Sequence, residues 1–133
     1  MKNYDVLYIG NYTKDTIISP AGTKHVDGGA VNYAAHAAAG LGFSVAVVTR
    51  LAKEDNHVVE KLFQAGIDCY PTYTPQSTLM TLKYPTSDPD IRKLSVSATS
   101  PAEIVPAVAD TESLRISGSL VGYSSVISVD CGV

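Results

Sequence analysis

The most constraining feature of this sequence is a repeated alternation between a short apolar run and a helical pattern. Residues 4–10 (YDVLYIG) and 43–50 (FSVAVVTR) are rich in β-branched and aromatic residues, which is typical of buried strands. An Ala-rich run follows the first at 30–39, and an amphipathic segment follows the second at 53–66. Strand, helix, strand, helix predicts a parallel sheet with crossover helices, and therefore an α/β core.

The amphipathic segment predicts which of its side chains lie inside. Val58, Val59, Leu62 and Phe63 share one face and are expected in the core. The acids of this segment are expected to form one solvated face of the helix: Glu54, Asp55 and Glu60.

The pattern changes from residue 67 to residue 99. Three short extended runs follow one another, IDCYPTYT, STLMTLKYP and RKLSVSAT, separated by prolines and by the polar stretch TSDPD. We expect these runs, with part of 12–27, to form a small antiparallel sheet that serves as a lid. The chain is then a single domain over 1–133, with 67–99 as its main insertion.

The last part of the chain leaves two alternatives open. Residues 114–117 (LRIS) and 126–130 (VISVD) both look like core strands, and only eight residues separate them. Parallel neighbours need a crossover of about a dozen residues or more. Either the second strand runs antiparallel to the first, or a connecting helix is missing.

A glycine pair before the Ala-rich helix indicates a ligand site. Gly28 and Gly29 let a ligand approach the backbone, and a helix start presents free N–H groups. Asn32 can both donate to and accept from a hydroxyl, and Asp15 follows the first strand, at the sheet edge where open α/β folds bind ligands. The alternatives are a glycine pair used for packing, an Asp15 that stabilises a turn, and an Asn32 that makes a packing hydrogen bond.

Composition excludes several classes of function. The net charge of -3 over 133 residues gives no basic surface for nucleic acid or for anionic lipid. The first residues resemble neither a signal peptide nor a membrane span, so we expect a cytoplasmic protein with Cys69 and Cys131 as reduced thiols. His25 and His57 have no partners at metal-ligand spacing, so no metal site is predicted.

Together these segments resemble the opening of the ribokinase (PfkB) family of carbohydrate and nucleoside kinases. The resemblance rests on IGNYTKDTI, then GGAVNYAA with GLG, then VAVVTRLAKEDN, and it extends through RKLSVS to ISVD. It implies a Rossmann-like, mostly parallel sheet flanked by helices, with a small β-sheet lid. It also implies substrate contacts from Asp15, Gly28, Gly29 and Asn32. Thr13 is a weaker candidate because many members carry Asn there.

The resemblance stops short of the family's catalytic end. The second motif, GAGD, which supplies the anion hole and the catalytic Asp, does not occur, and neither does a GxxxxGK[ST] loop. We therefore expect an incomplete ribokinase-like domain without its C-terminal half, with no catalytic residue of its own. ATP and Mg²⁺ are implied for an intact family member but not for this chain.

The leading interpretation is a sugar-kinase-like protein that binds a sugar, inositol or nucleoside and is inactive alone. One rival is a non-catalytic, oligomeric interaction module or gene remnant. A second rival is a Rossmann-like nucleotide binder, although GxGxxG is missing. Because an incomplete parallel sheet exposes an apolar edge, we expect a homodimer or larger assembly through the lid or the sheet edge.

Overall fold

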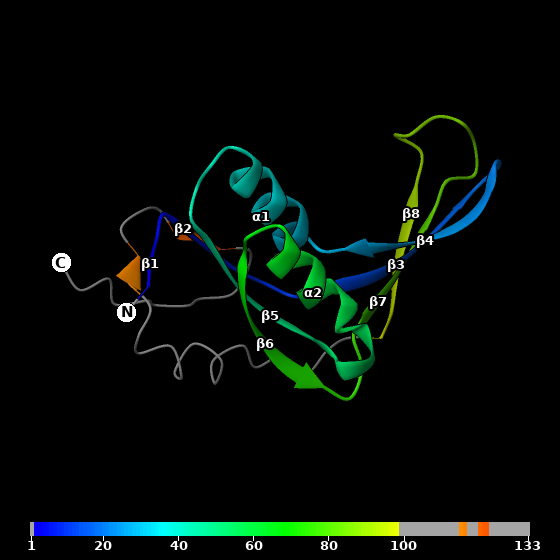
Figure 1. The fold of residues 1–133 in the computed structure, drawn as a ribbon. Helices are drawn as coiled ribbons and strands as arrows, with labels where there is room; N and C mark the ends of the chain where they lie inside the picture. The colour runs from blue at the N-terminus through cyan, green and yellow to red at the C-terminus, as the bar shows by residue number, and fades with distance from the viewer. Residues whose placement is uncertain (1, 99–114, 117–119, 123–133) are drawn as a thin grey trace.

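The computed structural model describes residues 2–98, 115–116 and 120–122, and it contains an α/β core with a second sheet beside it (Figure 1). The strands are β1 (Asn3–Tyr4), β2 (Val6–Ile9), β3 (Thr13–Ser19), β4 (Gly22–Gly28), β5 (Val45–Ala52), β6 (Asp68–Thr74), β7 (Thr78–Lys83), β8 (Lys93–Ala98), β9 (Arg115–Ile116) and β10 (Leu120–Gly122). The helices are α1 (Ala30–Gly40), the 3-10 turn η1 (Lys53–Asp55) and α2 (His57–Gln64).

The core sheet has the order β10-β2-β5-β6, and every pairing in it is parallel. Strand β5 lies between β2 and β6, and all eight of its residues are buried. That explains why its sequence is almost uniformly apolar rather than alternating. The parallel α/β core predicted from the alternating apolar runs is confirmed.

Helices α1 and α2 pack on the same face of the core sheet. Ala35 and Ala38 of α1 join Val58, Val59 and Leu62 of α2 in one hydrophobic cluster with β5. Small Ala side chains let α1 approach the sheet closely. Phe63 was expected on this buried face, but it is 53% exposed and lies just outside the apolar stripe.

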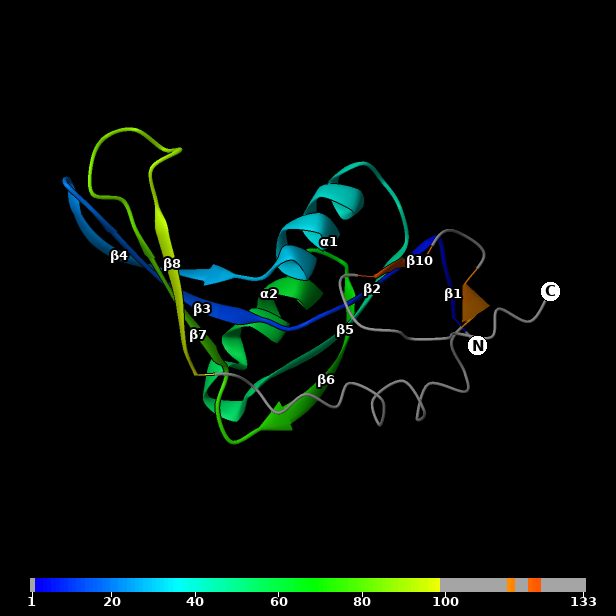
Figure 2. The same cartoon turned by 180° about the vertical axis from the view of Figure 1, so that it is seen from behind.

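The second sheet has the order β4-β3-β7-β8, and we call it the lid sheet. Strands β3 and β4 form an antiparallel hairpin, β7 and β8 pair antiparallel, and β3 and β7 pair parallel. It extends to one side of the core in both views (Figures 1 and 2). The expected lid is present, although it is mixed rather than purely antiparallel.

The boundary of the lid differs from the prediction in one place. Strand β6 belongs to the core sheet beside β5, so the part of the lid after residue 67 begins at β7. Pro71 is tolerated within β6 because, in the described chain, this strand pairs on one side only, with β5. Within the part of 12–27 expected in the lid, β4 is a regular strand that pairs with β3 over its full length.

The end of the chain is described only in part. Strand β9 pairs parallel with β1, and β10 pairs parallel with β2. Strand β10 falls inside the stretch expected to be a connection, so a short strand replaces the predicted loop there. The predicted strand at 126–130 and Cys131 lie outside the described residues.

Candidate functional site

The predicted site residues lie where the lid sheet meets the core. Tyr12, between β2 and β3, is 1% exposed, and its backbone N–H donates to the Arg50 carbonyl (3.3 Å) and to Thr49 Oγ1 (3.1 Å). These bonds fix the point at which the chain leaves the core sheet and enters the lid. Thr13 and Asp15 come directly after it on β3.

Thr13 and Asp15 converge over Gly28. Thr13 is the register partner of Gly28 in the β3–β4 hairpin, and Asp15 lies two residues further along the same face. A Cβ placed on Gly28 would lie 2.5 Å from Thr13 Oγ1 and 2.6 Å from Asp15 Cγ. Glycine at this position therefore leaves the space into which both polar side chains project.

Gly29 has a different requirement, which is conformational. Its φ of 98° lies in the region that L side chains avoid, and a Cβ there would lie 2.7 Å from the Asn11 carbonyl oxygen. Gly29 is the N-cap of α1, and its carbonyl accepts from the Asn32 N–H (3.0 Å). The two glycines therefore have different roles. Gly28 leaves space for the side chains of Thr13 and Asp15, and Gly29 adopts the backbone conformation that leads into α1.

Two buried acceptors at this junction have no hydrogen-bond partner within the described part of the chain. They are Asp15 Oδ1 and Asn11 Oδ1. A buried oxygen of this kind costs about 1–3 kcal/mol unless a donor reaches it. Asp15 also lies within a strand rather than a turn, so the expectation that it stabilises a turn receives no support.

Asn32 is held by a local hydrogen bond. Its Nδ2 donates to the Asp27 carbonyl at 3.4 Å. The amide nitrogen of Asn32 therefore makes the packing hydrogen bond that was the alternative to ligand binding. Because that carbonyl is part of the peptide that leads into Gly28, Asn32 is tied to the same backbone segment as the glycine pair.

Sequence reasoning missed the role of three charged residues. Asp55, expected on a solvated helix face, is 2% exposed; it pairs with Lys14 Nζ (2.7 Å) and accepts from Ser77 Oγ (2.6 Å). Hydrogen bonding to Asp55 raises the pKa of Lys14. Asp27 accepts from Tyr12, His57 and Lys61. No spacing rule links residues so far apart in sequence, and only the sheet register brings them together.

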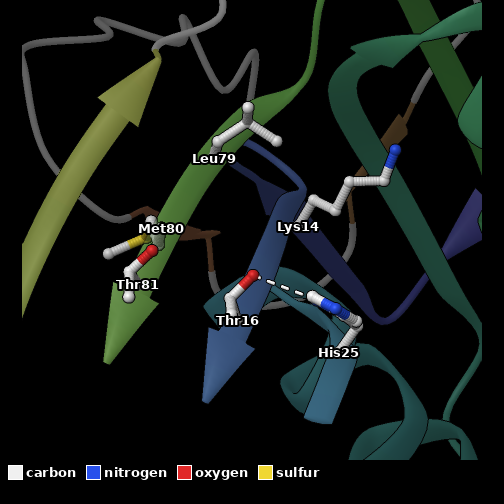
Figure 3. Close-up of a pocket in the computed structure, with 6 residues that line it drawn as sticks. All are labelled: Lys14, Thr16, His25, Leu79, Met80 and Thr81. Atoms are coloured by element: carbon white, nitrogen blue, oxygen red, sulfur yellow. Dashed lines mark hydrogen bonds between the residues drawn. The ribbon is translucent and has the colours of Figure 1, made fainter. Parts of the chain in front are cut away.

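A pocket of about 300 Å³ lies elsewhere, on the opposite face of the lid sheet (Figure 3). Alternation along β3 places Lys14 and Thr16 on this face, and Thr13 and Asp15 on the other. Thr16 Oγ1 and His25 Nδ1 lie 3.0 Å apart at its rim. Its lining residues are Lys14, Thr16, His25, Leu79, Met80 and Thr81; among them Met80, the register partner of Asp15, is the one that alternation places on the other face. This pocket is separate from the predicted site.

Two negative findings apply to the described residues. Within 2–98, 115–116 and 120–122, no three His, Cys, Asp or Glu side chains form a group that could hold a metal ion. In the same residues, no helix combines the length and apolar character needed to cross a membrane. Cys69 is a buried free thiol, and burial raises its pKa to about 12.

Solved structures place the fold among known kinases. A pyrophosphate-dependent kinase of the ribokinase family, in a sulfate complex, is 24% identical, with a TM-score of 0.71 over 84% of this chain and 40% of its own. A structure of such a kinase with a pyrophosphate analogue and myo-inositol is 20% identical, with a TM-score of 0.68 over 78% of this chain and 35% of its own. The fructokinase of Halothermothrix orenii is 18% identical, with a TM-score of 0.58 over 72% of this chain and 38% of its own.

These likenesses establish the fold as ribokinase-like, and the predicted resemblance is confirmed at that level. The chain spans 34–40% of the length of the neighbouring structures, which include a PfkB protein from Polaromonas. No protein-family model matches the chain, and no curated protein is significantly similar to it in sequence.

Proposed function

We propose that this chain binds a small polyhydroxylated compound, a sugar, inositol or nucleoside, at the junction of lid and core. The observation that carries the proposal is the buried Asp15 Oδ1, which has no partner among the described residues; the other oxygen of the same carboxylate, Oδ2, lies over Gly28. A carboxylate accepts hydrogen bonds from adjacent hydroxyls, and these bonds are stronger than bonds between neutral groups. A polyol is therefore the ligand class that best supplies the missing donors.

In this proposal the other site residues have distinct roles. Thr13 Oγ1 accepts from or donates to a second hydroxyl, and Asn32 supplies an amide oxygen as a further acceptor. Gly28, having no side chain, leaves room for Thr13 and Asp15 to project at the site, and Gly29 turns the chain into the helix that carries Asn32. Asn11, which sequence reasoning did not select, adds another buried acceptor, Oδ1.

Myo-inositol is the first compound to test. One neighbouring kinase was solved with myo-inositol, and another neighbour is a fructokinase. Because sequence identities near 20% establish only the fold, a panel should also contain fructose, ribose and a nucleoside.

We further propose that the chain alone does not transfer a phosphoryl group. Phosphoryl transfer depends on positioning the donor and stabilising the charge of the transferred group. This sequence has neither GAGD nor a Walker-type loop. An assay with ATP or pyrophosphate as donor, with Mg²⁺ present, is expected to show no turnover with any polyol. Robust turnover would overturn this part of the proposal.

Thermal unfolding with the polyol panel tests the binding proposal. A ligand at a hundred times its Kd stabilises the native state by about 2.7 kcal/mol, which raises Tm by several degrees. Asp15→Asn keeps the shape of the side chain but removes its charge, and should abolish the shift. No shift with any polyol favours the non-catalytic interaction module. Stabilisation by ATP or NAD instead of polyols favours the nucleotide binder.

We also propose that this chain is a cytoplasmic protein and that it forms a homodimer. Leu94 and Val96 of β8 are 56% and 51% exposed, which is unusual for large apolar side chains. Strand alternation and register place them on the same lid face as Asp15, along with Ile17, Val26, Met80 and Leu82. Such a face is normally covered. Light scattering should report a dimer that Leu94→Lys dissociates, and a wild-type monomer at high concentration would contradict the proposal.

A further inference from the structure

Asp27, the last residue before the glycine pair, lies at the centre of a polar network. Its carboxylate accepts from Tyr12 OH (2.8 Å) and lies 3.0 Å from His57 Nε2 and 2.7 Å from Lys61 Nζ. His57 and Lys61 are one helical turn apart on α2, so both reach the same carboxylate. The side chain of Asp27 is 24% exposed, whereas those of His57 and Lys61 are 47% and 58% exposed, so the network lies at the surface with its carboxylate partly covered.

The backbone of Asp27 is also engaged. Its carbonyl accepts from Asn32 Nδ2 at 3.4 Å and from Tyr33 OH at 3.1 Å, both from the first turn of α1. The carboxylate therefore holds strand β4 to α2, while the carbonyl holds it to α1. Asp27 is the residue through which both helices contact the end of the lid hairpin.

This anchoring matters because the next two residues are the glycine pair. Gly28 and Gly29 have no side chains with which to fix their own position, and glycine has the greatest conformational freedom of any residue. Asp27 is the register partner of Lys14, whose ammonium pairs with Asp55. The base of the hairpin is thus held by short ion pairs from both strands, Lys14 to Asp55 and Asp27 to Lys61, with longer contacts to Glu54 and His57 beside them.

The Asp27 carboxylate is ionised at neutral pH. Burial alone would oppose its ionisation, but hydrogen bonds from Lys61, His57 and Tyr12 outweigh burial and lower its pKa to about 2. Charge-assisted hydrogen bonds of this type are stronger than bonds between neutral groups.

We infer that Asp27 is a positioning residue for the polyol site: its three side-chain partners and two backbone partners fix the Gly28–Gly29 segment and Asn32 against Asp15. Asp27 touches no ligand itself in this scheme. The predicted effect on ligand affinity rests on the proposed function. The predicted effect on amide exchange in the free protein does not.

Asp68 provides a matched control elsewhere in the molecule. At the start of β6 it accepts from Lys2 Nζ (2.8 Å) and Tyr4 OH (2.6 Å), and its side chain is 27% exposed. Asp27→Ala and Asp68→Ala each remove a carboxylate that pairs with a lysine and a tyrosine. Only the first network adjoins the glycine pair.

The experiment measures ligand affinity and amide hydrogen exchange in the full chain. For myo-inositol, calorimetry should show Asp27→Ala weakening binding about tenfold or more, and Asp68→Ala changing it less than about twofold. Asp27→Asn, which keeps an acceptor oxygen of the same shape, should fall between wild type and Asp27→Ala. In the free protein, Asp27→Ala should accelerate exchange of the amides of Gly28, Gly29 and Asn32, while Asp68→Ala leaves them unchanged.

The outcomes separate the two proposals. If wild type binds no polyol but Asp27→Ala still accelerates exchange at these amides, the ligand proposal fails and the positioning role stands. If wild type binds myo-inositol and Asp27→Ala binds equally well with unchanged exchange, the positioning role is wrong. If Asp27→Ala does not fold, the same measurements of myo-inositol affinity and amide exchange are made on Asp27→Asn instead.

Discussion

The core sheet and the lid sheet are held together in different ways. Strand β5 of the core is buried along its whole length, and side chains from both helices pack against it. The lid strand β8 has large apolar side chains that are more than half exposed, and no helix of the described chain belongs to the lid. The core is stabilised by apolar burial, whereas the lid is fastened to it at its base by ion pairs and hydrogen bonds.

This difference bears on the proposed binding site. Most buried polar atoms in folded proteins have a hydrogen-bond partner, yet the junction between core and lid contains two buried oxygens, Asp15 Oδ1 and Asn11 Oδ1, without one among the described residues. The proposed site therefore lies where apolar packing gives way to polar contacts.

The largest expected effect comes from opening a cavity in the core. Leu51 in β5 is 0% exposed, and Leu51→Ala should lower the free energy of unfolding by about 2–5 kcal/mol. In dilute, monomeric protein, Leu94→Ala in the lid strand β8 should change the free energy of unfolding by less than about 0.5 kcal/mol. Urea unfolding under these conditions measures both variants. Equal losses in the monomer would mean that the lid sheet is packed within one chain as thoroughly as the core.

The next effect tests the fastening of the lid. Lys14→Met leaves the buried Asp55 carboxylate without its cation, and should cost about 2–3 kcal/mol. It should also accelerate amide exchange in β3 and β4 more than in β5. Lys2→Met, which removes an exposed partner of Asp68, is the control and should have little effect. Uniform acceleration across both sheets would contradict the distinction between core and lid.

A smaller effect is expected from filling the space at Gly28. The Cβ of Gly28→Ala would collide with Thr13 and Asp15. The variant should therefore lose about 1–3 kcal/mol of unfolding free energy, and it should also lose ligand binding. Gly40→Ala is the matched control, because nothing lies within 4 Å of a Cβ at that position. Thermal unfolding with and without myo-inositol separates the two variants. A Gly28→Ala protein that retains binding would show that the ligand does not depend on the positions of Thr13 and Asp15 over Gly28.

The smallest effect is a pH dependence centred on Asp27. Its pKa is lowered from an ordinary 3.8 to about 2, so the ionised form stabilises the folded state above pH about 4. That stabilisation is lost as pH falls from about 4 to about 2. Partial exposure limits it to about 1 kcal/mol. Acid unfolding of wild type and Asp27→Asn should therefore differ in this range, and identical profiles would show that Asp27 adds no stability.

The sequence predicted the core better than the lid, and the reason is physical. Burial on both faces gives β5 a continuous apolar run, and Ala-rich α1 has a strong local propensity. Strand β4 (GTKHVDG) carries no such signal, because most of its residues are exposed and its partner β3 supplies the pairing. Assignment of β6 to the lid failed because a short extended run does not report which sheet it will join: β6 pairs with the core and β7 with the lid.

The candidate site was predictable in its glycines and only partly in its polar residues. Gly28 and Asp15 were selected from their order in the chain, and the hairpin register brings them together. Asp55 was expected on a solvated helix face, and Asp27 was not selected at all. Their roles depend on Lys61 and Lys14, which approach from other elements, and no local pattern reports such long-range pairs.

A ¹H–¹⁵N NMR titration of the full chain with myo-inositol tests the central claim most directly. The account predicts saturable shifts at the amides of Asp15, Gly28, Gly29 and Asn32, all lost in Asp15→Asn. Shifts confined to Thr16, His25 and Thr81, around the pocket on the opposite lid face, would contradict it. So would a spectrum that no polyol of the panel changes.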